Sequence, residues 1–300
     1  MILVTGAAGF IGSHLIPHLR AADLPVRAMV RPGSPKQYLA RQGVEVVEGD
    51  VTRPLSLLPA LRGVETVIHL VGLIREPPGV TFEAVVAEGT RSLLRAAEEA
   101  GVRRFVYVSG IGARLDALSR YARTKAIAEG IIRRGACDYV IVRPSVVYGP
   151  GDELVELFRN WPVPLPGDGK VHIQPILVDQ LVEILRQCAE RGDLANQTFE
   201  VGGPTPITYN EMARTINRVS GRRLPHPHVP LSLMEAQAWF LEMLKKPLHS
   251  LGLSIPLTRD QALMMTVDNF CEVNHIEHTF GLELISFEDG LRSYLKPAAA

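Results

Sequence analysis

The chain has 300 residues, of which 46% are hydrophobic and 21% charged, and this composition is that of an ordinary globular protein. Its 32 basic and 32 acidic residues balance, which argues against nucleic acid as the main partner, because phosphate binding requires an excess of positive charge. The sequence has three cysteines, no signal-peptide pattern at its N-terminus and no apolar run of about 18 residues. We therefore expect a cytoplasmic protein without disulfides or a membrane-spanning helix.

Short apolar segments rich in β-branched residues alternate with helical patterns in the first half of the chain. They span residues 2–4, 26–30, 44–47, 66–70, 105–108 and 139–142. Continuous apolar strands of this kind are typical of a parallel sheet that helices cover on both faces. The clearest helix spans residues 81–100, where apolar residues recur at intervals of three and four. This order predicts an α/β fold with a Rossmann-type, doubly wound parallel sheet.

The regular alternation ends near residue 150. We expect a helix at 179–190 and a strand at 198–201 to return to the sheet, and capping sequences predict later helices after Thr208, Thr258 and Ser286. Residues 222–230 contain three prolines and are expected to form a linker. We therefore divide the chain into a dinucleotide-binding domain at 1–150, to which 176–202 return, and a smaller, mostly helical substrate cap within 151–300. The histidine pairs 226/228 and 275/278 lack the ligand number or spacing of a metal site, so no metal is expected.

Three glycines follow the first strand and open a helix. Gly6 allows a tight turn, Gly9 lets backbone N–H groups approach a pyrophosphate, and Gly12 lets the helix pack closely on the strand. The helix N-terminus attracts negative charge. In this context the GxxGxxG spacing predicts a dinucleotide-binding turn. Pro17 lies inside the same helix and is expected to kink it.

The residues after the second and third strands bear on the choice of dinucleotide. The second strand ends at Arg31, where an NAD-preferring site would carry Asp or Glu. A guanidinium can bind a 2′-phosphate through paired hydrogen bonds, and Ser34 and Lys36 could add donors. We therefore expect NADP(H) to be favoured over NAD(H), unless Arg31 is only a solvated surface charge. Asp50 and Val51 follow the third strand, where an adenine would lie, although Asp50 could instead cap the next turn.

Tyr121 and Lys125 have a YxxxK spacing, which on a helix places both side chains on one face. A nearby cation favours a phenolate, so we expect the pKa of Tyr121 to be lowered and Tyr121 to act as a general acid or base. Lys125 is also placed to hydrogen-bond a ribose hydroxyl. Ser109 ends the fifth strand at the carboxyl edge of the sheet, where its hydroxyl could polarise a carbonyl.

Taken in order, these motifs resemble those of the extended, atypical short-chain dehydrogenases/reductases. The resemblance rests on TGAAGFIG (5–12), GD (49–50), VIHLVG (67–72), EGT (88–90), VYVSGIGA (106–113), YARTK (121–125) and RPSVVYGPGD (143–152). The stretches HLVG, SGIGA, QPILVDQ (174–180) and PLTRDQ (256–261) are similar, more narrowly, to the group of the dinucleotide-binding accessory subunit of respiratory complex I and its bacterial relatives.

The resemblance implies roles for individual residues. The residues that would hold the pyrophosphate are Gly6, Gly9, Phe10, Ile11 and Gly12. Those near the cofactor ribose are Leu70, Val71 and Gly72, and those near the nicotinamide are Pro144 and Val147. The chain departs from the family at Val86, where active extended members usually carry an Asn that supports the catalytic lysine through water.

We therefore expect an NADP(H)-dependent oxidoreductase or epimerase-like enzyme that acts on an unidentified small molecule through Tyr121, Lys125 and Ser109. The alternative is a catalytically silent NADP(H)-binding subunit, structural or redox-sensing, of a larger assembly such as a respiratory complex. Residues 231–251 are apolar and include two aromatic residues and two lysines. They are expected to pack over the cap or a protein partner, with peripheral membrane contact as the alternative.

Overall fold

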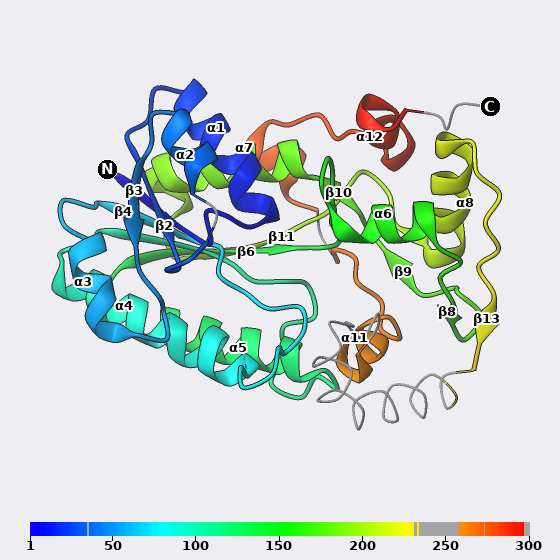
Figure 1. The fold of residues 1–300 in the computed structure, drawn as a ribbon, viewed down its shortest axis with the longest axis horizontal. Helices are drawn as coiled ribbons and strands as arrows, with labels where there is room; N and C mark the ends of the chain where they lie inside the picture. Colours follow the sequence, from blue (N-terminus) through cyan, green and yellow to red (C-terminus); the bar gives the residue numbers. More distant parts are fainter. Residues whose placement is uncertain (35, 231–232, 234–257, 273, 297–300) are drawn as a thin grey trace.

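A parallel sheet forms the centre of the molecule in the computed structural model, which describes all residues except 35, 231–232, 234–257, 273 and 297–300. Its strands are β1 (Ile2–Thr5), β2 (Val26–Val30), β3 (Glu45–Glu48), β4 (Thr66–His69), β5 (Arg104–Val108), β6 (Asp138–Pro144) and β11 (Gln197–Val201). All pair in parallel, in the order β11-β6-β5-β4-β1-β2-β3 (Figure 1). The expected doubly wound fold is thus confirmed, and its order reverses between β1 and β4, which is where ligands bind in such sheets.

Helices cover both faces of the sheet. On one face lie α1 (Phe10–Ala21), α2 (Gln37–Arg41) and α7 (Val178–Glu190), and on the other lie α3 (Leu57–Ala60), α4 (Gly89–Glu99) and α5 (Arg120–Ile132), with the short turn η1 (Pro54–Ser56) before α3. The helix expected at 81–100 is composite, because a π-helical segment, η2 (Glu83–Glu88), runs directly into α4. Pro17 lies within α1 on its exposed side.

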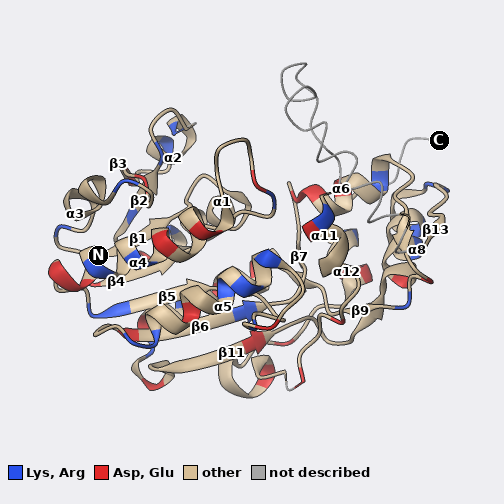
Figure 2. Cartoon of the chain, turned by 90° about the horizontal axis from the view of Figure 1, so that it is seen from below, with Lys and Arg blue, Asp and Glu red and all other residues tan. Residues whose placement is uncertain are grey.

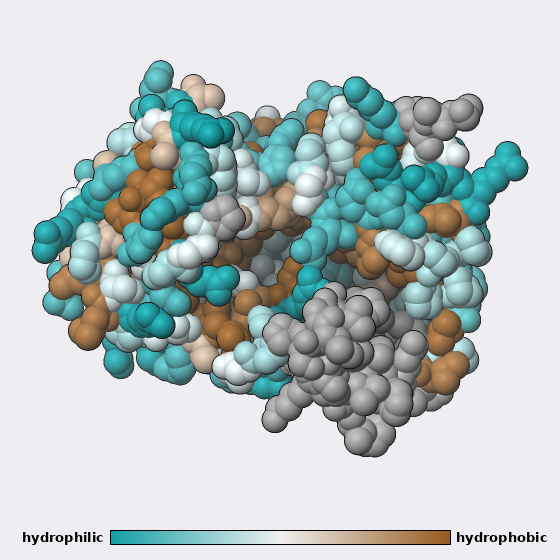
Figure 3. All heavy atoms as spheres, in the orientation of Figure 1, coloured by the Kyte–Doolittle hydropathy of each residue, from teal (hydrophilic) through white to brown (hydrophobic). Residues whose placement is uncertain are grey.

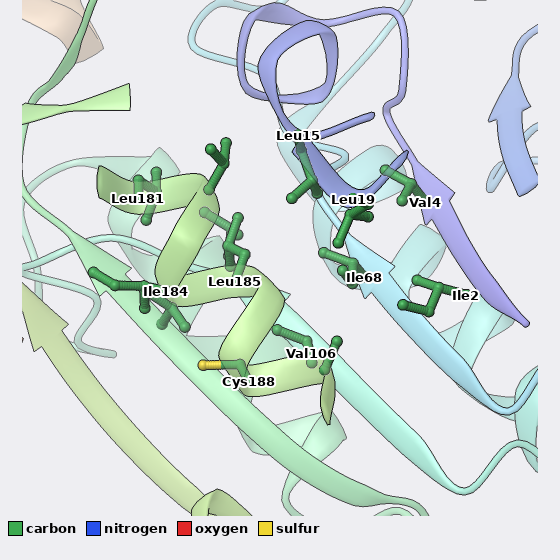
Figure 4. Close-up of a cluster of buried hydrophobic side chains, with 14 of the residues drawn as sticks. Ile2, Val4, Leu15, Leu19, Ile68, Val106, Leu181, Ile184, Leu185 and Cys188 are labelled. Carbon is green, nitrogen blue, oxygen red and sulfur yellow. The ribbon is translucent and has the colours of Figure 1, made fainter. Parts of the chain in front are cut away.

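The core between α1, α7 and the sheet explains why the chain returns to the first domain. Leu15 and Leu19 of α1 lie near Leu185 of α7, above Ile68 and Val106 of the sheet (Figure 4). All five side chains are fully buried. Burial of each stabilises the fold by about 1.5–3 kcal/mol, so the return of residues 176–201 covers apolar surface that the first 150 residues would expose.

Two of the remaining elements, the turns η3 (Gly192–Leu194) and η4 (Ile276–Phe280), pack on this same core. The others form a second, smaller packed region and are β7 (Val147–Tyr148), α6 (Glu153–Asn160), β8 (Leu165–Pro166), β9 (His172–Ile173), β10 (Ile176–Leu177), β12 (Ile207–Thr208), α8 (Tyr209–Ser220), β13 (His228–Val229), α11 (Arg259–Met264) and α12 (Phe287–Tyr294). Phe158, Ile216 and Leu291 belong to its apolar core. The capping boxes predicted at Thr208 and Thr258 are confirmed.

Two sequence predictions in this half have other outcomes. The predicted linker at 222–230 is extended, but it also contributes β13, which pairs in parallel with β8. The apolar stretch 231–251 lies outside the described residues except for Leu233, which is exposed.

The surface combines mixed charge with a central recess. Acidic and basic residues are interspersed over the helices (Figure 2). The molecule is hollowed between the sheet and the C-terminal helices, and apolar residues show in that recess (Figure 3). Within the part of the chain that the structure describes, no helix is long and apolar enough to cross a membrane.

Candidate functional site

The turn between β1 and α1 leaves no room for side chains at two of its glycines. Gly6 has φ +72°, and a Cβ there would lie 3.1 Å from the backbone of Leu70 and Val71. A Cβ on Gly12 would lie 2.5 Å from the carbonyl oxygen of Gly6 and 2.6 Å from that of Ala7. The start of α1 thus packs directly on the glycine turn, and the turn packs directly on the segment after β4, with no room for a Cβ between them. These contacts lie at the point where the strand order reverses.

The N-terminus of α1 can accept an anion. Its N-cap is Gly9, no side chain of the described residues caps the helix, and its first turn contains no acidic residue. Phe10 and Ile11, at its start, are partly exposed. The partial positive charge and the N–H groups of this helix end are therefore available to a pyrophosphate, so the cradle fits the dinucleotide that the sequence predicts.

The segment after β2 places a cation at the edge of this cradle. Arg31 is exposed, and its side chain makes no hydrogen bond or ion pair with any residue that the structure describes. Ser34 is partly buried, and its N–H donates to the carbonyl oxygen of Arg31 at 3.0 Å. The nearby Lys36 pairs instead with Glu48 at 2.5 Å. Of the two cations Arg31 and Lys36, Arg31 is therefore the one whose side chain is available to a ligand.

Asp50 and Val51 have structural contacts of their own. The Oδ1 atom of Asp50 accepts hydrogen bonds from the N–H and the hydroxyl of Thr52 at 2.8 and 2.7 Å, so Asp50 does cap the following turn. Val51 is buried in the core, and a Cβ on Gly89 of α4 would lie 2.7 Å from its side chain. These contacts account for both residues without a ligand.

The segment after β4 meets the helix that carries the YxxxK pair. Leu70 donates its N–H to Thr5 at 3.1 Å, so it extends the β1–β4 pairing. Gly72 is exposed, and a Cβ there would lie 3.3 Å from Nζ of Lys125. Leu70, Val71 and Gly72 therefore lie between the glycine turn and Lys125, which is consistent with a ribose site that both border.

Lys125 is almost fully buried and is held by aromatic and carbonyl groups. Its Nζ donates to the carbonyl oxygen of Val108 at 2.8 Å and lies 4.8 Å from the ring centroid of Tyr107 and 5.8 Å from that of Tyr121. Burial lowers the pKa of Lys125 to about 8, against the opposing effect of Glu129. The structure thus brings Tyr121 and Lys125 together, as their spacing predicts.

The predicted effect on Tyr121 is wrong in direction. Burial and the negative charge of Asp260 raise the pKa of Tyr121 to about 12 instead of lowering it. The ring packs edge-to-face on Phe82 at 5.9 Å, and the phenol oxygen lies 4.0 Å from where a Cβ of Gly110 would be. In this structure Tyr121 is therefore a neutral phenol, which can donate a proton rather than accept one.

Ser109 lies in a different cluster. Its hydroxyl donates to Oε1 of Glu129 at 2.6 Å. The same buried carboxylate accepts two hydrogen bonds from Arg143 at 2.8 and 2.7 Å and one from Arg133 at 2.8 Å. The hydroxyl proton of Ser109 is thus committed to an ion-pair cluster beneath the site, and the structure does not bring this hydroxyl to Tyr121.

The residues expected near the nicotinamide lie at the carboxyl edge of the sheet. Pro144 ends β6, and its carbonyl oxygen accepts a hydrogen bond from Ile111 at 3.1 Å. Val147 is partly buried in β7, which pairs with β10. Val86 is fully buried in the apolar core of the α4 and α5 side, so the position where Asn is usual in the family has no polar group here.

Sequence reasoning missed three residues around the pair: Tyr107, Glu129 and Asp260. Glu129 follows Lys125 by four residues and so shares its helix face, a signal that the sequence did contain. Asp260 comes from α11 and accepts hydrogen bonds at the start of α5, about 140 residues earlier in the chain. The sequence pointed to Asp260 only as a member of the PLTRDQ stretch (256–261) and gave it no role.

Comparison with known proteins agrees with this site. The NAD(P)H-binding family model matches residues 6–157. Over 160 residues the chain is 38% identical to the ceramide reductase of Caulobacter vibrioides, covering 53% of this chain and 50% of that protein. It is 28% identical over 235 residues to the mitochondrial NADH dehydrogenase (ubiquinone) 1 alpha subcomplex subunit 9 of Rattus norvegicus, covering 75% of this chain and 62% of that one. The chain thus spans between half and two thirds of the length of these relatives.

A solved structure extends the likeness to the whole fold. The triphenylmethane reductase of Citrobacter sp., complexed with NADP(H), superimposes with a TM-score of 0.74 at 23% identity, covering 98% of this chain and 99% of that one. The glycine cradle, the parallel sheet and the family match together show that the chain belongs to the NAD(P)H-binding family, in agreement with the resemblance of its motifs to those of the extended short-chain dehydrogenases/reductases.

Proposed function

We propose that the chain is an NADPH-dependent reductase in which Tyr121 donates the proton. The observation that carries this proposal is the neutral, partly buried phenol of Tyr121 beside the buried ammonium of Lys125, next to the glycine cradle. A bound nicotinamide would supply the hydride. Tyr121 would give its proton to the oxygen of the reduced carbonyl, and Lys125 would stabilise the phenolate that remains. Two relatives that are named as reductases support the reductive direction.

The proposed substrate is a ketone or aldehyde with an apolar body. The recess between the sheet and the C-terminal helices shows apolar residues, and burial of an apolar substrate there would be favourable (Figure 3). We propose that residues 1–150, with 176–202, bind the nucleotide and that the cap within 151–300 binds this substrate. The hydroxyl of Ser109 is engaged by Glu129, so we assign it no substrate contact.

The test is NADPH oxidation across a panel of carbonyl compounds of increasing apolar size. Tyr121→Phe should lower kcat by roughly 100-fold or more, as is typical of a lost general acid, with NADPH affinity unchanged. Tyr139→Phe is the matched control, because Tyr139 lies near the amino end of β6, away from the site. Equal turnover of the two variants would refute the role of Tyr121.

The preference for NADPH over NADH rests on Arg31. A bidentate contact with a 2′-phosphate is charge-assisted, so Arg31→Ala should weaken NADPH binding roughly tenfold or more and leave NADH binding unchanged. Arg41→Ala, which removes an exposed cation from the neighbouring α2, should affect neither nucleotide. Equal losses of NADPH and NADH affinity in Arg31→Ala would contradict this preference.

A second candidate is a nucleotide-binding protein without turnover. Val86 favours it, because this fully buried apolar side chain stands where active members of the family carry a polar one. The relative that is named as a subunit of NADH dehydrogenase fits this reading, in which the chain would serve a larger assembly. NADPH that raises the melting temperature but is not oxidised with any compound of the panel would favour this candidate over the reductase.

A further inference from the structure

The N-terminus of α5, the helix that carries Tyr121, is closed by a carboxylate from a distant element. Asp260 of α11 accepts hydrogen bonds from the N–H of Arg120 at 2.6 Å, the N–H of Tyr121 at 3.2 Å and the hydroxyl of Ser119 at 2.8 Å. Ser119 in turn accepts from the N–H of Ala122 at 3.2 Å. The first three N–H groups of α5 are thus all satisfied by this two-residue cap.

This arrangement is the opposite of that at α1. In α1 no described side chain or first-turn acid occupies the helix end, which leaves it open to an anion. In α5 the protein provides its own anion, and the first turn contains no other acidic residue. A phosphate or carboxylate of a ligand therefore has no vacant helix end beside Tyr121, and the partial positive charge there is neutralised by Asp260.

We propose that Asp260 is the positioning residue for Tyr121: its carboxylate holds the first turn of α5, including the backbone N–H of Tyr121, and so fixes where the phenol lies. The negative charge of the same carboxylate also opposes loss of the phenolic proton. This inference rests on the proton-donating role proposed for Tyr121. Asp260 bonds directly to the backbone of Tyr121, so displacement of α11 would shift the phenol itself.

The other charges near Tyr121 do not replace this effect. Among the described residues, the other ionisable groups lie on α5 itself and on the segments next to it. They are Arg120, Arg123, Lys125 and Glu129 of α5, Glu83 and Glu88 of η2, Arg91, Arg95, Glu98 and Glu99 of α4, Tyr107 of β5, Arg259 of α11, and Glu76. Arg120 is paired with both Glu76 and Glu83, at 3.0 Å each. Lys125 is a cation, and it favours loss of the phenolic proton. Asp260 is the carboxylate that hydrogen-bonds to Tyr121 itself, and it opposes Lys125.

The experiment compares Asp260→Asn with Glu211→Gln. Glu211 accepts hydrogen bonds from Thr208 at the start of α8, so its substitution removes a similar first-turn carboxylate far from Tyr121. Titration of the phenolate ultraviolet absorbance is measured for each protein with and without Tyr121→Phe, and the difference isolates Tyr121. Asp260→Asn should raise the acid dissociation constant of the Tyr121 phenol roughly tenfold or more, whereas Glu211→Gln should leave that constant unchanged.

The outcomes show whether Asp260 affects the phenol of Tyr121 or only caps and stabilises the N-terminus of α5. A Tyr121 titration in Asp260→Asn that equals that of the parent would overturn the proposal, even if the variant is less stable. Asp260→Ser keeps a neutral cap and carries the same expectation, so it serves if Asp260→Asn does not fold. Because the titration needs no turnover, its result stands whether or not the reductase activity is found. If the protein does reduce carbonyls, displacement of the phenol should lower kcat in both variants with NADPH affinity retained, even though the phenol itself becomes a stronger acid.

Discussion

Gly12→Ala tests the nucleotide cradle most directly. The added methyl group would lie 2.5 and 2.6 Å from the carbonyl oxygens of Gly6 and Ala7, and both contacts are with backbone. No side-chain rotation can relieve them, so the start of α1 must move away from the turn. Overpacking of this kind costs about 1–3 kcal/mol of stability. The N–H groups of the same helix end would no longer point at a pyrophosphate.

The loss of NADPH affinity should exceed the loss of stability. Each hydrogen bond from an N–H group to a charged phosphate contributes about 1.5–3 kcal/mol, and about 1.4 kcal/mol corresponds to a tenfold change in Kd. Gly12→Ala should therefore weaken NADPH binding roughly tenfold to a thousandfold, as measured by calorimetry on protein that circular dichroism shows to be folded. The control is Gly192→Ala, since a Cβ at Gly192 would meet nothing within 4 Å. Equal affinities in the two variants would refute the assignment of the cradle.

Three further predictions concern the surroundings of the site. Tyr107→Leu should destabilise the protein by about 2 kcal/mol or more in urea unfolding, because the ring contacts the buried ammonium of Lys125. Tyr107→Phe keeps the ring and should cost less than about 1 kcal/mol, because the Tyr107 hydroxyl has no hydrogen-bond partner among the described residues. Ser109→Ala should cost about 1–2 kcal/mol of stability, as Glu129 loses a donor, but leave NADPH oxidation nearly unchanged; abolished turnover in a stable variant would place Ser109 at the substrate. Arg186 holds the pKa of Glu183 down to about 2, so this carboxylate stabilises the fold above its ordinary pKa and the stability is lost as the pH falls toward 2. In Glu183→Gln the free energy of unfolding should fall less between roughly pH 5 and pH 2 than it does in the parent protein. An equal fall in both proteins would contradict the pairing of Glu183 with Arg186.

The local parts of the fold were predictable from the sequence. Parallel strands reveal themselves as short apolar runs, and the glycine turn reveals itself because sterics at Gly6 and Gly12 admit no other residue. The same holds for Tyr121 and Lys125, which helix geometry alone places on one face. The predicted boundaries of β3 were wrong by one residue at each end, because the apolar Val44 lies before the strand and the charged Glu48 ends it.

Contacts between distant segments were not predictable in this way. Ser109 directly follows β5, and a side chain at the end of a strand can lie on either side of the sheet. The sequence therefore does not show that the Ser109 hydroxyl points toward Glu129 rather than toward Tyr121. The capping box at Thr258 predicted where α11 starts but not which helix end its Asp260 would reach. The predicted direction of the pKa change at Tyr121 was wrong for the same reason, because the pKa depends on burial and on the distant carboxylate of Asp260.

The two pKa changes at the site both favour the protonated phenol of Tyr121. A tyrosine that takes a proton from an alcohol must ionise readily, and this requires a well-solvated, strongly charged lysine beside it. Here burial brings the pKa of Lys125 down to about 8, and the π-helical segment packed against α5 brings the apolar Val86 rather than a polar side chain. Lys125 is left with one carbonyl and two aromatic rings, and Asp260 adds a negative charge at the backbone N–H of Tyr121. Each of these features makes the phenolate costlier, so Tyr121 stays protonated in the protein without ligand. A tyrosine that donates its proton is itself left as phenolate, so these features favour neither the reductive nor the oxidative direction, and the buried ammonium of Lys125 is the group that stabilises the phenolate when it forms.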